Sequence, residues 1–196
     1  MVMEIVRYPK RDQWKALSAR PALDVTTLFD SVRAVLDEVR KEGDSAVKRY
    51  EEKFDKVVLD SLRVTEEEIK EAAALVPDDL KQAILAAKKN IEAFHAAQRF
   101  EGCTVETIPG VTCRQKAVPI EKVGLYIPGG TAPLFSTVLM LAVPARIAGC
   151  REIVLCTPPL RDGKVNPAIL FTAEAAGVSR IYKIGGIQAI GAMAYG

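Results

Sequence analysis

The feature that most constrains the fold is the stretch 122–149, KVGLYIPGGTAPLFSTVLMLAVPARIAG. Val123, Leu125 and Ile127 form a short run of residues that favour β-strands. Pro128-Gly129-Gly130 ends this run, and apolar residues then recur at helical spacing. A strand, a tight glycine turn and a helix form the opening half of a βαβ unit, so this stretch predicts a parallel α/β sheet.

The same turn is a candidate ligand site. Because glycine lacks a Cβ, an anionic ligand can approach the main-chain N–H groups at the start of the following helix. The G-x-G-x-x-G spacing of the dinucleotide fingerprint is absent, however. The turn alone is therefore compatible with a phosphate or cofactor cradle and with an ordinary βα connection.

Residues 183–196, KIGGIQAIGAMAYG, repeat the pattern: an apolar run ends at Gly185-Gly186 and a helix follows. In a parallel sheet both glycine turns lie at the carboxyl edge, which is where open α/β sheets bind ligands. The repetition favours a binding site at this edge. Gln188 falls in the first turn of the second helix, where its amide either reaches a ligand or faces solvent.

The remaining elements follow from periodicity and turn signals. We predict strands over 123–127, 153–157 and 181–184 and helices over 133–148, 167–176 and 187–194. Before Gly102 the chain is mostly helical in pattern, and a hairpin is predicted around Pro109-Gly110. The fold class is therefore α/β, with a helical amino-terminal region and a hairpin over 1–118 and a Rossmann-like parallel sheet over 119–196.

Charge and cysteine usage exclude several classes of protein. The net charge is +2 with both signs mixed along the chain, which argues against a nucleic-acid surface. No apolar run is long enough to span a bilayer, and charged residues interrupt the first positions, so neither a membrane partner nor a signal peptide is predicted. The four cysteines lack metal-ligand spacing and are expected to be reduced thiols in the cytoplasm.

The residues alone indicate no acid, base, nucleophile or metal site. The single histidine, His95, lies at the margin of an apolar helical face, and one histidine cannot build a multi-histidine metal site. Glu66-Glu67-Glu68 are explained as acids in the first turn of a helix. Cys156 falls in a predicted buried strand and Cys150 follows a helix end, where cysteine acts as a small apolar residue.

Several segments together resemble the histidinol dehydrogenase family. They are VGLYIPGGTAPLFSTVLMLAVPARIAGC, IVLCTPP and GGIQAIGAMAYG, with IEAFHAAQ and the hairpin that leads into PIEKVGLYIPGG. The resemblance covers essentially the whole chain in order, and its glycine-turn motifs are specific. It implies an aldehyde-dehydrogenase-like fold and a homodimeric enzyme that uses NAD and zinc.

The family resemblance also implies a reaction and site residues. The family oxidises L-histidinol to L-histidinaldehyde and then to L-histidine, and two hydrides pass in succession to two NAD molecules. Tyr126 of GLYIPGG and Gln188 of GGIQAI match the family's dinucleotide-contacting positions. Pro128, Gly129 and Gly130 are expected to form the wall beside them.

This sequence departs from the family in one respect. It stops at Gly196, before the family's zinc ligands, its catalytic glutamate-histidine pair and a further dinucleotide-contacting asparagine. We therefore expect an amino-terminal portion of the enzyme with no catalytic or metal residues, an α/β region incomplete at its carboxyl end, and no activity alone. Two other classes stay open: a non-catalytic α/β nucleotide-binding module and a cysteine-dependent reductase related to aldehyde dehydrogenases.

Overall fold

The computed structural model describes residues 5–20, 24–130 and 132–196. Ahead of the hairpin lie η1 (Arg11–Gln13), α1 (Trp14–Leu17), η2 (Thr26–Leu28), α2 (Phe29–Glu42), α3 (Asp44–Tyr50), the π-helical turn η3 (Glu51–Asp55), α4 (Glu66–Leu75) and α5 (Asp78–Ala96). The rest comprises β1 (Cys103–Ile108), β2 (Val111–Gln115), β3 (Lys122–Tyr126), α6 (Phe135–Ala148), β4 (Glu152–Thr157), α7 (Pro167–Ala176), β5 (Arg180–Lys183) and α8 (Gly186–Tyr195). The predicted order of elements and the α/β class are confirmed.

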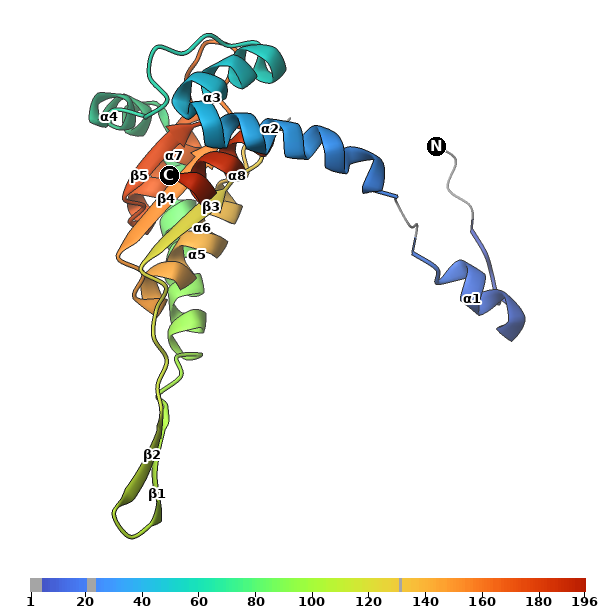
Figure 1. The fold of residues 1–196 in the computed structure, drawn as a ribbon, viewed down its shortest axis with the longest axis vertical. Coiled ribbons are helices and arrows are strands. Elements are labelled where there is room, and N and C mark those ends of the chain that lie inside the picture. The colour runs from blue at the N-terminus through green and yellow to red at the C-terminus, as the bar shows by residue number, and fades with distance from the viewer. Residues whose placement is uncertain (1–4, 21–23, 131) are drawn as a thin grey trace.

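A parallel sheet in the order β3-β4-β5 forms the centre of the molecule (Figure 1). Leu125 is in register with Leu155, and Leu155 with Ile181. All three side chains are buried, and Leu155 on the central strand has no exposed surface. The predicted parallel sheet of at least three strands is therefore confirmed.

Helices bury both faces of this sheet. Leu155 belongs to a core cluster with residues of α7, whereas its neighbour Cys156 belongs to a cluster with α2 and α3. Because successive strand residues point to opposite faces, the two clusters lie on opposite sides of β4. On one side α6 and α7 pack with α5 and α4, and on the other α8 packs with α2 and α3.

The amino-terminal helices thus share their core with the sheet. Each of the three core clusters combines residues from before and after Val118: Val47 with Cys156, Ala72 with Ile127, and Ile84 with Leu125. The division into regions 1–118 and 119–196 stays a prediction.

Two segments project from this body (Figure 1). The antiparallel hairpin β1–β2 extends away from the sheet, and every residue of both strands is exposed. The short helix α1 lies apart from the rest of the chain (Figure 1). The hairpin itself was predicted from its turn residues.

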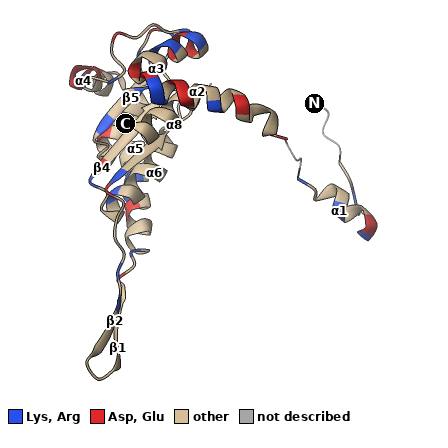
Figure 2. Ribbon diagram, in the orientation of Figure 1, with Lys and Arg blue, Asp and Glu red and all other residues tan. Residues whose placement is uncertain are grey.

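Charged residues of both signs are interspersed along α2 and α3 (Figure 2). Arg49, for example, pairs with Glu38 and Glu42 across these two helices. None of the helices in the described ranges is both long and apolar enough to cross a bilayer.

One sheet contact was not predicted. The link between η3 and α4 pairs with the edge strand β5. Val64 N–H donates to the Ile181 carbonyl at 3.0 Å, and Lys183 N–H donates to the Leu62 carbonyl at 2.7 Å. These bonds satisfy backbone groups on an edge that is otherwise open, and they place η3 beside the carboxyl end of β5.

Replacing Thr65 with Ala is expected to lower the free energy of unfolding by about 1 kcal/mol, because it removes the N-cap of α4. Thr65 Oγ1 accepts the Glu68 N–H at 3.2 Å, and Glu68 Oε2 accepts the Thr65 N–H at 2.8 Å. T65S keeps the hydroxyl and is the matched control. Urea unfolding followed by circular dichroism measures both variants, and an equal loss in T65S would contradict the capping role.

Candidate functional site

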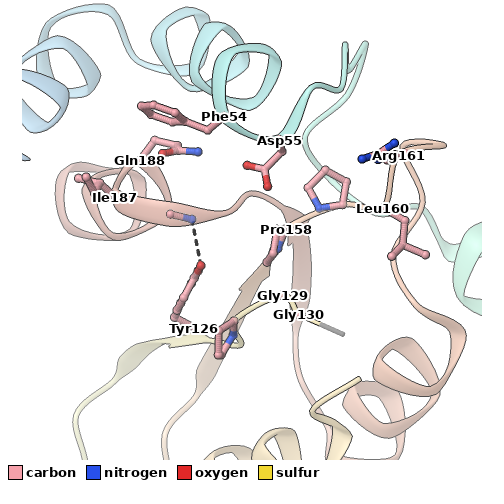
Figure 3. A pocket seen from close by; sticks show the side chains of 13 residues that line it. Phe54, Asp55, Tyr126, Gly129, Gly130, Pro158, Leu160, Arg161, Ile187 and Gln188 are labelled. Carbon is pink, nitrogen blue, oxygen red and sulfur yellow. Dashed lines mark hydrogen bonds between the residues drawn. The ribbon is translucent and has the colours of Figure 1, made fainter. Parts of the chain in front are cut away.

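A pocket of about 620 Å³ lies at the carboxyl edge of the sheet (Figure 3). A volume of this size suits a small molecule or cofactor. Four segments enclose it: η3, the β3–α6 turn, the β4–α7 connection and the start of α8. The residues that line it are Phe54, Asp55, Tyr126, Pro128, Gly129, Gly130, Pro158, Pro159, Leu160, Arg161, Gly186, Ile187 and Gln188.

All five sequence-predicted site residues therefore line one pocket. Tyr126 ends β3, and its hydroxyl oxygen accepts the Gly186 N–H at 2.9 Å (Figure 3). This bond joins the first strand-glycine unit to the second, as expected for two turns at one edge of a parallel sheet. The juxtaposition is observed, whereas the contact of these residues with a cofactor stays a prediction.

The glycine turns allow close packing at the pocket wall. A Cβ on Gly129 would lie 2.6 Å from Pro158 Cγ, and a Cβ on Gly185 would lie 2.8 Å from Pro158 Cβ. Both glycines are therefore needed sterically where the two turns meet the β4–α7 connection. Gly186 starts α8 with φ +56°, a left-handed conformation that favours glycine.

Gln188 does not face solvent, which excludes one of the two placements that the sequence left open. Its side chain is fully buried, and its Nε2 donates to Glu51 Oε1 at 2.8 Å. The same Glu51 oxygen accepts the Gly185 N–H at 3.0 Å. Glu51 thus ties the glycine turn and the first turn of α8 to η3.

Sequence reasoning missed two acids of this site, Glu51 and Asp55. Burial raises the pKa of Glu51, although hydrogen bonds from Gln188 and Gly185 oppose the shift. Burial also raises the pKa of Asp55, which lines the pocket. One signal was available: Glu51 follows Val47 by four residues, so a helical pattern places this acid on an apolar face.

Arg161 was missed as well and gives the pocket a positive group on the β4–α7 connection (Figure 3). The pocket therefore combines a carboxylate from η3, a guanidinium from the loop after β4, and the polar tips of Tyr126 and Gln188. Such a mixture of apolar walls and a few polar groups is typical of sites that orient an organic ligand.

Cysteine chemistry is not favoured at this pocket. Cys156 is buried, and burial raises the pKa of its thiol to about 12. A reactive cysteine needs the opposite shift, because the thiolate is the nucleophile. Cys150 is partly buried and lies outside the pocket lining.

No group of three or more His, Cys, Asp or Glu side chains able to hold a metal ion occurs in the described ranges. His95 lies on α5, where its Nδ1 is 2.9 Å from Gln98 Oε1. The donor set that the described residues offer therefore does not fit zinc.

The fold and pocket define an α/β protein with a ligand-sized site at the carboxyl edge of a parallel sheet. A family model described as histidinol dehydrogenase matches residues 18–196. The chain belongs to the histidinol dehydrogenase family.

Individual relatives agree with this assignment. The chain is 65% identical over 195 residues to a histidinol dehydrogenase of Bacteroides thetaiotaomicron, covering 100% of this chain and 46% of that protein. It is 52% identical over 186 residues to that of Salmonella typhimurium, covering 94% of this chain and 42% of the relative. The chain spans less than half the length of these curated relatives.

The structure is similar to a crystal structure of histidinol dehydrogenase from Elizabethkingia anophelis. The TM-score is 0.91 at 52% sequence identity, and the match covers 96% of this chain and 43% of that one. The similarity therefore extends to nearly all of the present fold.

Proposed function

We propose that this chain forms the amino-terminal part of a histidinol dehydrogenase and supplies one wall of its NAD site. The enzyme would oxidise L-histidinol through L-histidinaldehyde to L-histidine in histidine biosynthesis. The observation that carries the proposal is the meeting of the two glycine turns at one pocket, with Tyr126 bonded to Gly186. Family membership supports the reaction.

The residues present fit a dinucleotide. Tyr126, Pro128, Gly129, Gly130 and Gln188 would hold it, and the turns leave space where side chains would otherwise stand. Gln188 Oε1 is buried without a hydrogen-bond partner, so a donor group on a ligand would satisfy it. Arg161 could pair with a phosphate as a forked donor.

The chain's own residues would bind and orient the cofactor. The Tyr126 hydroxyl uses a lone pair for the Gly186 N–H, so its proton remains able to donate to an acceptor on the ligand. Pro158, Pro159 and Leu160 provide an apolar wall that excludes water. NAD, when bound, would accept the hydride from the substrate carbon.

Zinc has no site among the described residues, and no step of the reaction is assigned to it on this chain. We also propose that the protein is a homodimer, since the family is dimeric. A cytoplasmic location is proposed as well. The small net charge of +2 supports a small molecule rather than a nucleic acid as partner.

Tyr126→Phe is expected to weaken NAD binding about fivefold, which corresponds to roughly 1 kcal/mol for one lost hydrogen bond. The ring is retained, so the loss reports the hydroxyl. Gln188→Ala should weaken binding by a similar amount. Isothermal titration calorimetry of the intact enzyme that contains this chain measures both.

The matched control is Tyr182→Phe, because Tyr182 lies on β5 outside the pocket lining. Its NAD affinity should equal that of the wild type. Unchanged affinity in both Tyr126→Phe and Gln188→Ala would contradict the assignment of this pocket to NAD.

A further inference from the structure

Glu51 is a fully buried acid outside the set of residues that the family resemblance indicates. Its Oε1 accepts two hydrogen bonds, from Gly185 N–H at 3.0 Å and from Gln188 Nε2 at 2.8 Å. Its other oxygen, Oε2, and the Gln188 Oε1 are both buried, and neither is paired with a hydrogen-bond donor among the described residues. Buried polar atoms are normally hydrogen-bonded, so two unpaired oxygens in one buried cluster beside a pocket require an explanation.

The Gly185 bond fixes the orientation of the Gln188 amide. A backbone N–H can only donate, so Glu51 Oε1 must be an acceptor. The Gln188 atom that faces this oxygen must then be the NH₂ group. The Gln188 carbonyl oxygen is therefore the group that remains for a ligand, and it can only accept.

Asp55, one helical turn along η3, is the acid that interacts with the Glu51 carboxyl group. A hydrogen bond between two carboxyl groups requires a proton on one of them. Glu51 is the more deeply buried acid, so it is the one that desolvation favours in the neutral form. Asp55, which lines the pocket, then keeps its charge.

The groups around Glu51 agree with a neutral acid. The titratable side chains that face it are Asp55 on its own element and the buried Cys156 thiol on β4. From α8 it meets the uncharged Gln188 amide. None of these neighbours supplies a positive charge that would stabilise a buried carboxylate.

We propose that Glu51 is a positioning residue that shares a proton with Asp55 and orients the Gln188 carbonyl oxygen to accept a hydrogen bond from the dinucleotide. The donor would be a ribose hydroxyl or the carboxamide NH₂, the donor groups that such a ligand carries on its sugars and its nicotinamide. This role rests on the proposed NAD site. Figure 3 shows Asp55 and Gln188 on the η3 and α8 side of the pocket.

Infrared spectroscopy tests the proton itself, without a ligand. In a pH titration of the full chain, the absorption of one protonated carboxyl group should persist to higher pH than that of an ordinary glutamate, and Glu51→Gln should remove it. Glu52→Gln is the matched control, since Glu52 is the exposed neighbour in the same turn, and it should leave the band unchanged. A band that persists in Glu51→Gln, or is absent from the wild type, would overturn the proposal.

The pH dependence of stability gives a second readout. Because the pKa of Glu51 is raised on folding, its favourable contribution is fully present below the unfolded pKa and is lost as pH rises toward the folded pKa. Glu51→Gln lacks this loss, so its melting temperature relative to the wild type should rise as pH increases from the unfolded pKa of glutamate toward the raised folded pKa. A constant difference between the two proteins would contradict a proton on Glu51.

The NAD affinities of two Glu51 variants distinguish a role in positioning Gln188 from a role in packing alone. Gln at position 51 can still accept from Gly185 and Gln188 and can donate to Asp55, so Glu51→Gln should bind NAD within about twofold of the wild type. Glu51→Leu should bind roughly fivefold or more weakly, because the Gln188 amide loses its anchor. Equal losses in the two variants would overturn the positioning role. If the wild type fails to bind NAD, the proposed function fails, while the infrared result still decides where the proton resides.

Discussion

Iodoacetamide is expected to modify Cys156 at least about a thousand times more slowly than an exposed thiol of ordinary pKa at about pH 8. Burial raises the pKa of Cys156 from 9.0 to about 12, which lowers the thiolate fraction by roughly three orders of magnitude. The side chain is also only 2% exposed, so the reagent has little access to it. Mass spectrometry of peptides from a timed reaction measures the rate at each cysteine.

The chain contains its own controls in Cys103 and Cys113, which are both exposed on the hairpin. These two should be labelled first, and Cys156 should become reactive only after unfolding in urea. Labelling of folded Cys156 at the rate of Cys103 would contradict its burial. That outcome would reopen the cysteine-dependent reductase that the sequence left as an alternative.

Local patterns were enough to predict the sheet. The apolar run Val123, Leu125 and Ile127 is typical of a strand, and the glycines after it cannot continue one. The same rule located β4 and β5, and parallel connectivity then brought both glycine turns to one edge. The position of the pocket therefore followed from residues that are near one another in sequence.

The polar contacts beside the pocket could not be predicted from local sequence patterns. Glu51 and Gly185 are 134 residues apart, and their hydrogen bond forms only because η3 lies against the start of α8. The hydrophobic periodicity of the sequence does not indicate such a contact. The pairing of Val64 with Ile181, which places η3 there, is equally a tertiary effect. Burial of Gln188 by Glu51 was therefore beyond sequence reasoning, which left it either facing a ligand or facing solvent.

The sequence did assign the correct structural role to one group of acids. Glu66, Glu67 and Glu68 lie in the first turn of α4, as predicted, and Thr65 and Glu68 form a capping box there. Glu68 also pairs with Lys183 at 2.7 Å and is occupied structurally. Asp55, the acid that lines the pocket, comes from a turn that no motif in the sequence indicated.

The chain alone is expected to oxidise L-histidinol at least about a thousandfold more slowly than an intact histidinol dehydrogenase, and to bind no stoichiometric zinc. Catalytic zinc needs about three protein ligands. The sequence has one histidine, and the described residues hold no cluster of three metal-binding side chains. Proton removal from the substrate hydroxyl also needs a base within hydrogen-bonding reach, and the acids at the pocket are engaged in the Glu51–Asp55 cluster.

The measurement follows NADH absorbance with L-histidinol, NAD and added zinc, together with the metal content of the purified chain. The histidinol dehydrogenase of Bacteroides thetaiotaomicron, which is 65% identical over this region, is the matched positive control. The folded state of the chain is checked by circular dichroism, so that inactivity is not confused with unfolding. Turnover comparable to the control and abolished by a chelator would mean that the catalytic groups lie within these 196 residues and that the assignment of this chain to cofactor binding alone is wrong.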